Sequence, residues 1–120
     1  GTDSLQIGEK SYLDLDEPCV FFNHSCDPNS VIVDRNKLVA VKNIKNGEEI
    51  FFDYSATEWT IDDVVRKFGE WSMKCRCGSK LCRKIIKGFP FLAQSLQIKY
   101  IKNKSVQDFI VRKYKKCHGK

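Results

Sequence analysis

The sequence has no apolar run that approaches the ~20 residues a helix needs to span a bilayer. Its opening stretch, GTDSLQIGEK, lacks the basic and apolar regions of a secretory signal peptide, and no internal repeat or low-complexity linker interrupts the chain. At 120 residues the chain is near the size at which one core is enough for folding. We therefore expect a single soluble, intracellular domain, nuclear or cytoplasmic.

The charge balance is basic, with a net charge of +6. Such a field favours acidic partners such as nucleic acid or an acidic protein. Much of the excess lies in KYIKNK and VRKYKK, which we interpret as solvated faces of helices. Aromatic residues do not alternate with the basic ones in a stacking pattern, so any affinity for nucleic acid would come mostly from phosphate charge. We expect no membrane partner.

Short strands are predicted for the first half of the chain. Residues 4–15 have the pattern of a strand or hairpin, and the β-branched runs SVIV and KLVAVK are joined by DRN, which indicates a second hairpin. In NIKNGEEIFFDY, the Asn46-Gly47 pair is typical of a tight turn, because both residues tolerate positive φ. The apolar residues 50–54 then predict a further strand.

Helices are predicted after residue 60, where the hydrophobic period changes from two to about 3.6. Residues 60–69 carry one apolar face, with a cap at Thr60 and a stop at Gly69. Residues 91–100 follow Pro90, and residues 106–114 follow Ser105, each with apolar residues at helical spacing. The expected fold is therefore mainly β, with short C-terminal helices.

Three of the six cysteines lie in CRCGSKLC, as Cys75, Cys77 and Cys82. This spacing suits a zinc ion, which takes four tetrahedral ligands in a structural site. The best candidate for the fourth ligand is Cys26, in the irregular loop NHSCDPN. Disulfides, three thiolates with a water, or His24 as fourth ligand stay open as alternatives. Two further cysteines have bland interpretations, as a small core residue and a free thiol in the tail: Cys19 and Cys117.

Three motifs together resemble a known family. FFNHSCDPN at 21–29, NGEEIFFDY at 46–54 and CRCGSKLCR at 75–83 stand in the order found in SET-domain protein lysine methyltransferases with a post-SET zinc segment. The resemblance implies a SET-like (β-clip) fold with a threaded loop. It assigns residues 1–70 to the C-terminal part of the SET domain, 71–90 to the post-SET zinc-binding segment and 91–120 to a helical C-terminal extension.

The resemblance also implies a reaction and its cofactors. It predicts an S-adenosylmethionine-dependent transfer of methyl groups to a protein lysine, for which histone tails are the commonest substrate, together with a bound Zn²⁺. The zinc ligands would be Cys26, Cys75, Cys77 and Cys82. Tyr54 matches the catalytic tyrosine, and the residues that would contact the cofactor are Asn23, His24, Arg76 and Tyr54.

The resemblance further implies a narrow substrate channel formed by Phe52, Ile85 and Phe89. Family members carry Phe or Tyr at the position of Phe52. A Tyr there restricts the space around the amine by holding a water, whereas Phe leaves room for a methylated amine. Phe52 therefore predicts di- or trimethylation.

One family motif is missing from the sequence. SET domains carry a GxG motif in their N-terminal half that binds the methionine part of the cofactor, and these residues contain no GxG. We therefore expect the GxG portion to be absent from this chain, and self-association or a second chain is one way to complete the pocket. Two alternatives follow: a catalytically inactive SET-like, zinc-stabilised protein-interaction module, or an unrelated zinc module that binds nucleic acid.

Overall fold

The computed structural model describes residues 4–6, 12–14, 23–35, 37–59, 67, 69 and 71–118. Within these ranges the chain forms short strands paired in twos, followed by two α-helices near the C-terminal end. This arrangement confirms the predicted fold class. None of the described helices is long and apolar enough to cross a membrane. The strands are β1 (Ser4–Gln6), β2 (Tyr12–Asp14), β3 (Asn23–His24), β4 (Ser30–Val33), β5 (Lys37–Ala40), β6 (Phe51–Phe52), β7 (Ser72–Lys74) and β8 (Ile85–Lys87).

Both predicted hairpins are present. β1 pairs antiparallel with β2, and β4 pairs antiparallel with β5, with Val33 opposite Lys37. At the β4–β5 turn, Asp34 and Arg35 both have positive φ, of 48° and 74°. A distant side chain holds this turn: Gln107 accepts a hydrogen bond from the Arg35 N–H at 2.6 Å and donates one to the Arg35 carbonyl at 2.9 Å.

The NHSCDPN loop lies along the segment that follows the Asn46-Gly47 turn. β3 pairs with β6 in parallel over two residues, Asn23 opposite Phe51 and His24 opposite Phe52. Beyond this short ladder the contact is made by a side chain, because Asn29 accepts from the Phe51 N–H at 2.9 Å and donates to the Glu49 carbonyl at 2.9 Å. The loop is irregular because a side-chain amide takes the place of strand pairing.

The predicted strand over 50–54 is shorter in the structure. β6 ends at Phe52, and the 3-10 helix η2 (Tyr54–Thr57) begins directly after Asp53. The Asp53 carboxylate accepts from the Ser55 N–H at 2.9 Å and so caps this turn. A buried cap of this kind offers the backbone an alternative to strand pairing.

The two predicted C-terminal helices are present, each starting a few residues late. Pro90 lies within the 3-10 helix η3 (Phe89–Phe91), and α2 (Gln94–Lys102) follows this turn. The last helix, α3 (Asp108–Cys117), starts after Gln107. The helix predicted over 60–69 falls largely on residues outside the described ranges, as does Cys19.

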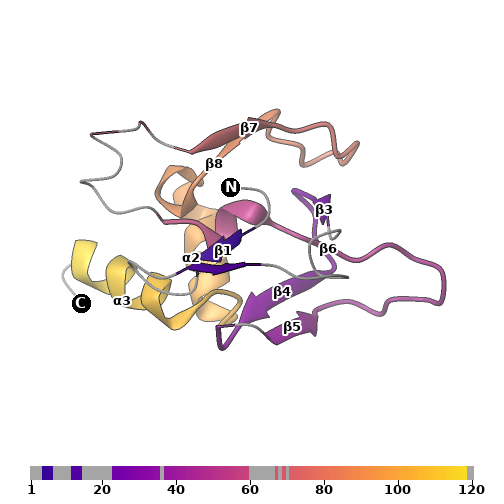
Figure 1. Ribbon diagram of the computed structural model, residues 1–120, viewed down its shortest axis with the longest axis horizontal. Coiled ribbons are helices and arrows are strands. Elements are labelled where there is room, and N and C mark those ends of the chain that lie inside the picture. The colour runs from indigo at the N-terminus through magenta and orange to yellow at the C-terminus, as the bar shows by residue number, and fades with distance from the viewer. Residues whose placement is uncertain are drawn as a thin grey trace.

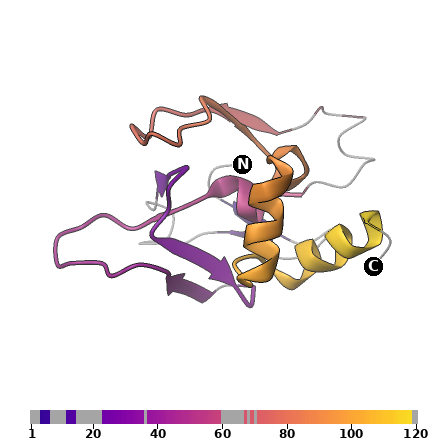
Figure 2. The ribbon, with the colours of Figure 1, turned by 180° about the vertical axis from the view of Figure 1, so that it is seen from behind.

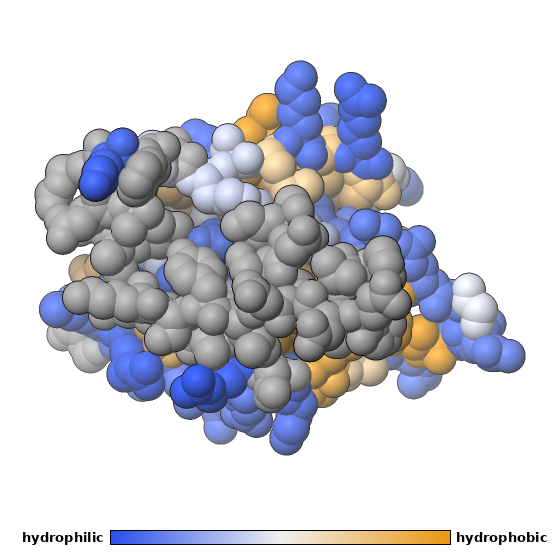
Figure 3. All heavy atoms as spheres, viewed as in Figure 1, coloured by the Kyte–Doolittle hydropathy of each residue, from blue (hydrophilic) through white to orange (hydrophobic). Residues whose placement is uncertain are grey.

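The helices pack on η2 and η3 to form the largest buried cluster among the described residues, whose members are Ala56, Phe89, Leu92, Tyr100, Val106, Phe109 and Ile110. Figures 1 and 2 show the β7–β8 hairpin and the β4–β5 hairpin on opposite sides of the molecule, with η2 and α2 between them. On the face seen in Figure 3, hydrophilic side chains project over the β7–β8 end, and hydrophobic residues are visible beside β4 and β5. The two hairpins are thus separated by η2 and α2.

Phe89 is the centre of the C-terminal core. It is 0% exposed and stacks on Trp59, with ring centroids 5.7 Å apart. We expect Phe89→Ala to lower the free energy of unfolding by about 3–5 kcal/mol, because it removes a fully buried ring and leaves a cavity. Denaturant unfolding monitored by circular dichroism measures this change.

Phe91 provides the matched control, since it lies two residues away and is 54% exposed. Its ring has Lys87 Nζ 5.3 Å from the centroid, an exposed cation–π contact. We expect Phe91→Ala to cost less than about 1 kcal/mol. Equal losses for the two variants would contradict the position of the core.

Candidate functional site

Four cysteine sulfurs from two distant parts of the chain meet at one point. Cys26 comes from the loop after β3, and Cys75, Cys77 and Cys82 come from the loop between β7 and β8. Their Sγ atoms all lie within 4.8 Å of one another, and those of Cys26 and Cys75 are 3.7 Å apart. Tetrahedral zinc with Zn–S bonds of ~2.3 Å places its sulfurs about 3.8 Å apart. The donor set and spacing therefore fit a zinc ion.

The alternatives for this cluster can be compared with the geometry. All four cysteines are free thiols in the structure, so no disulfide joins them. The fourth sulfur at the cluster is that of Cys26, and His24 contacts this sulfur from outside the group. Gly78, with φ of +76°, turns the backbone between Cys77 and Cys82. Cys117 is exposed near the end of α3.

The surroundings shift the pKa values of three thiols of the cluster in different directions. Burial raises the pKa of Cys26 and raises that of Cys75 to about 12. Burial also opposes ionisation of Cys77, but hydrogen bonds from the backbone of Cys26 and Ser79 and from the neighbouring thiols lower its pKa to about 6. Of these three thiols Cys77 is the one most readily deprotonated, and a thiolate is the form that binds metal.

His24 connects the sulfur cluster with Tyr54. Its Nδ1 accepts the backbone N–H of Tyr54 at 3.0 Å, and its Nε2 lies 3.3 Å from Cys26 Sγ. Because Nδ1 accepts this hydrogen bond, Nε2 of the neutral ring carries the hydrogen and donates a hydrogen bond to the sulfur. Burial lowers the pKa of His24, against the nearby Asp53 carboxylate, which raises it. The ring is therefore neutral at pH 7.

Tyr54 lies between two aromatic side chains at the start of η2. Its ring centroid is 5.2 Å from that of His24, edge to face, and 5.0 Å from that of the buried Phe52. Burial raises the pKa of the Tyr54 phenol. At neutral pH the Tyr54 hydroxyl is therefore protonated, and it can act as a fixed dipole beside the apolar ring of Phe52.

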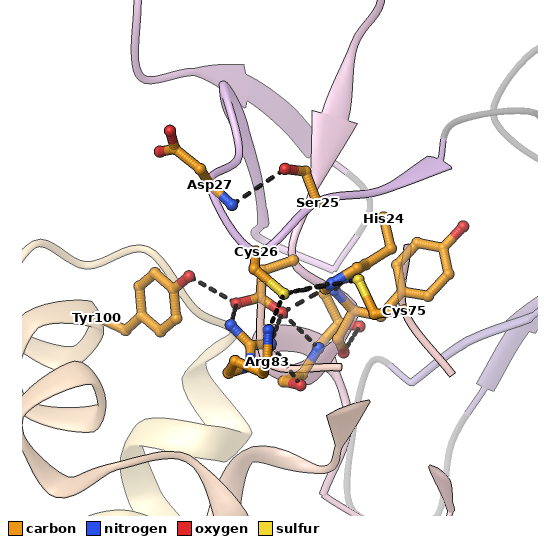
Figure 4. Close-up of polar contacts among 11 residues, drawn as sticks. His24, Ser25, Cys26, Asp27, Cys75, Arg83 and Tyr100 are labelled. Carbon is orange, nitrogen blue, oxygen red and sulfur yellow. Dashed lines mark hydrogen bonds and ion pairs between the residues drawn. The ribbon is translucent and has the colours of Figure 1, made fainter. Parts of the chain in front are cut away.

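A buried carboxylate beside Tyr54 is the feature that the sequence motifs did not predict. The Asp53 carboxylate accepts hydrogen bonds from two guanidinium nitrogens of Arg83, at 2.7 and 3.0 Å, and from the Tyr100 hydroxyl at 2.8 Å. Figure 4 shows Tyr100 pointing from α2 toward Arg83, with Cys26 and Cys75 on the other side. An acidic residue inside the apolar run FFDY indicates a buried cation, since an unpaired buried charge is costly. That signal could have indicated a cationic partner without identifying Arg83, whereas no signal indicated Tyr100.

The other predicted site residues lie around this centre at different depths. Asn23 is exposed and donates to Glu49 at 2.7 Å. Arg76 and Ile85 line a hollow of about 560 Å³ beside the cysteine cluster, and Ile85 is 51% exposed. Phe89 is buried in the C-terminal core. Its place in a substrate channel stays a prediction.

Comparison with known proteins identifies the family to which the first two motifs are similar. Residues 3–55 match the SET domain family model, and they include the first two motifs and Tyr54. Residues 3–55 are therefore SET-domain sequence. The sulfur cluster adds to this match, because three of its cysteines lie beyond the matched residues and still meet the cysteine of the SET-domain motif NHSC.

Relatives of this SET-domain chain are named as methyltransferases. "Methyltransferase flvH" of Aspergillus flavus is 31% identical over 118 residues, covering 92% of this chain and 59% of the relative. The Arabidopsis thaliana "Histone-lysine N-methyltransferase ASHH2" is 38% identical over 97 residues, covering 75% of this chain and 5% of the relative. An H3 lysine-9 specific enzyme of Fusarium mangiferae, KMT1, is 39% identical over 87 residues, covering 58% and 23%. The chain thus spans 59% or less of each of these three relatives.

The sulfur cluster predicts the effect of removing one ligand. We expect Cys26→Ser to weaken zinc binding by more than about 100-fold, because one of four thiolates is lost. Competition with a chromogenic zinc chelator measures the affinity, and elemental analysis should give one zinc per chain in the unmodified protein.

Cys117→Ser is the control, because this exposed thiol lies outside the cluster. It should keep both the zinc content and the affinity of the unmodified protein. Retention of full zinc affinity by Cys26→Ser would contradict the four-sulfur site.

Proposed function

We propose that this SET-domain chain acts in an S-adenosylmethionine-dependent protein-lysine N-methyltransferase. The observation that carries the proposal is the meeting of three motifs: Cys26 joins the late cysteines, while His24 on the same loop contacts Tyr54. The names of the relatives support the same activity. A four-thiolate zinc site leaves no open coordination position, so the zinc is proposed to be structural.

The cofactor would supply an electrophilic methyl group on a sulfonium. Backbone groups at Asn23 and His24 are proposed to contact its adenosine portion, since the Asn23 amide and both His24 ring nitrogens already have partners in the protein. Arg76, in the hollow beside the cluster, is proposed to approach the cofactor from the post-SET side. The cofactor is therefore proposed to lie next to Tyr54.

Tyr54 and Phe52 are proposed to prepare the target lysine. Methyl transfer requires a neutral amine, although free lysine titrates near ~10.4. The apolar surface of Phe52 beside Tyr54 disfavours the charged ammonium, which lowers its pKa. The protonated Tyr54 hydroxyl then orients the amine nitrogen toward the methyl group and stabilises developing charge.

The proposed substrate is a histone tail lysine, on the strength of the relatives that are named histone-lysine methyltransferases. A nuclear location follows from such a substrate. Because Phe52 leaves room around the amine, di- or trimethylation is the proposed product.

Removal of the Tyr54 hydroxyl tests the activity. In the full-length protein we expect Tyr54→Phe to lower kcat by about 10²–10³-fold, because the variant loses a dipole aimed at the reacting atoms. Methyl transfer from S-adenosylmethionine to histone peptides, read by mass spectrometry, measures the rate. Tyr114→Phe is the matched control, since Tyr114 packs edge to face on Phe89 in the C-terminal core.

The outcome distinguishes the proposal from its alternative. Saturable cofactor binding by calorimetry, with turnover that Tyr54→Phe removes, supports the enzyme. Full zinc content without cofactor binding or turnover in the unmodified protein would instead favour a zinc-stabilised interaction module.

Phe52 predicts the degree of methylation. We expect Phe52→Tyr to stop the reaction at monomethyl-lysine, because the added hydroxyl and a water that it binds occupy the space of a methyl group. Phe51→Tyr is the control: Phe51 precedes Phe52 on β6, so its side chain points to the opposite face. The mass spectrum of the product after exhaustive reaction decides between them, and an unchanged product for Phe52→Tyr would remove the argument for multiple methylation.

A further inference from the structure

The Asp53 carboxylate is saturated with donors from three parts of the chain. Its Oδ1 accepts Arg83 Nη2 at 2.7 Å and the Ser55 N–H at 2.9 Å. Its Oδ2 accepts Arg83 Nη1 at 3.0 Å and the Tyr100 hydroxyl at 2.8 Å. Arg83 belongs to the cysteine segment and Tyr100 to α2, so the carboxylate joins both to η2.

Asp53 directly precedes Tyr54 in the sequence. The backbone at Tyr54 is held from both sides, by its own N–H on His24 Nδ1 at 3.0 Å and by the next N–H, of Ser55, on Asp53 at 2.9 Å. The direction of the Tyr54 side chain therefore depends on where the Asp53 carboxylate is held.

Tyr100 carries a hydroxyl that packing alone does not need. The side chain is 6% exposed and lies in the apolar C-terminal cluster, where a phenylalanine ring would fill the same space. Its hydroxyl donates to Asp53 Oδ2, which otherwise has only the longer bond from Arg83. The last torsion of an aspartate is soft, so a second donor on this oxygen fixes the plane of the carboxylate.

We propose that Tyr100 is a positioning residue for the methyl transfer proposed above: its hydroxyl fixes the Asp53 carboxylate against Arg83, and so sets the position of Tyr54. The inference rests on the proposed function for its kinetic consequence. It makes α2, a helix beyond both the SET-domain match and the cysteine segment, part of the active centre.

The kinetic test uses the full-length protein and three variants. We expect Tyr100→Phe to lower kcat about tenfold while KM for the peptide changes by less than about twofold, because misplacement of a reacting group affects the chemical step more than binding. Tyr114→Phe, another tyrosine of the same core, should keep kcat. Leu96→Ala, which loosens the packing of α2 without touching Asp53, should lower the melting temperature at least as much as Tyr100→Phe and still keep kcat.

A second measurement does not depend on turnover. Amide hydrogen exchange at Tyr54 and Ser55, followed by NMR, reports the two hydrogen bonds that hold this turn. We expect exchange at both amides to be at least about tenfold faster in Tyr100→Phe, beyond any change in Leu96→Ala. Zinc content should stay the same in all variants.

The possible failures are distinct. An unmodified protein without methyl transfer overturns the proposed function, and the amide exchange then decides the positioning role by itself. An active protein in which Tyr100→Phe loses no more kcat and no more amide protection than Leu96→Ala overturns the positioning role and leaves the proposed function intact.

Discussion

The architecture depends on one buried carboxylate, that of Asp53, which is met by a guanidinium, a phenol and a backbone N–H. A carboxylate that is 2% exposed is costly unless its charge and all its lone pairs are matched. Here the guanidinium belongs to Arg83 and the phenol to Tyr100, which follow Asp53 by 30 and 47 positions. The requirement to satisfy this one group therefore brings the β7–β8 segment and α2 against the turn that begins at Tyr54.

The sulfur cluster forms a second connection between the same parts of the chain. Cys26 and Asp53 lie on segments paired through β3 and β6, while Cys82 and Arg83 are neighbours in sequence. His24 links the two connections, because one ring nitrogen contacts Cys26 and the other holds the Tyr54 backbone. The sulfur cluster and the backbone of Tyr54 are thus connected through a single imidazole.

Much of this could be predicted from residue patterns that act locally or through unusual chemistry. The apolar pattern of residues 4–15 predicted a strand or hairpin, and β-branched runs with a turn predicted the β4–β5 hairpin. Helical spacing predicted α2 and α3, and thiol spacing led to the sulfur cluster. The end of β6 could not be predicted, since Asp53 ends the strand with a side-chain cap whose other partners are distant in sequence. Tyr100 was also missed, because a tyrosine at a core position of a helix looks the same whether or not its hydroxyl has a buried acceptor.

The two hydrogen bonds between the Gln107 side chain and the Arg35 backbone make the β4–β5 hairpin depend on a distant part of the chain. A hairpin with a three-residue connection is normally the most local unit of a fold, yet here both main-chain groups of a left-handed tip residue are bound by an amide 72 positions away. Closing so long a loop carries an entropic cost that is met only when α3 is in place. The hairpin should therefore acquire its final shape late in folding, and its tip should report the docking of the last helix.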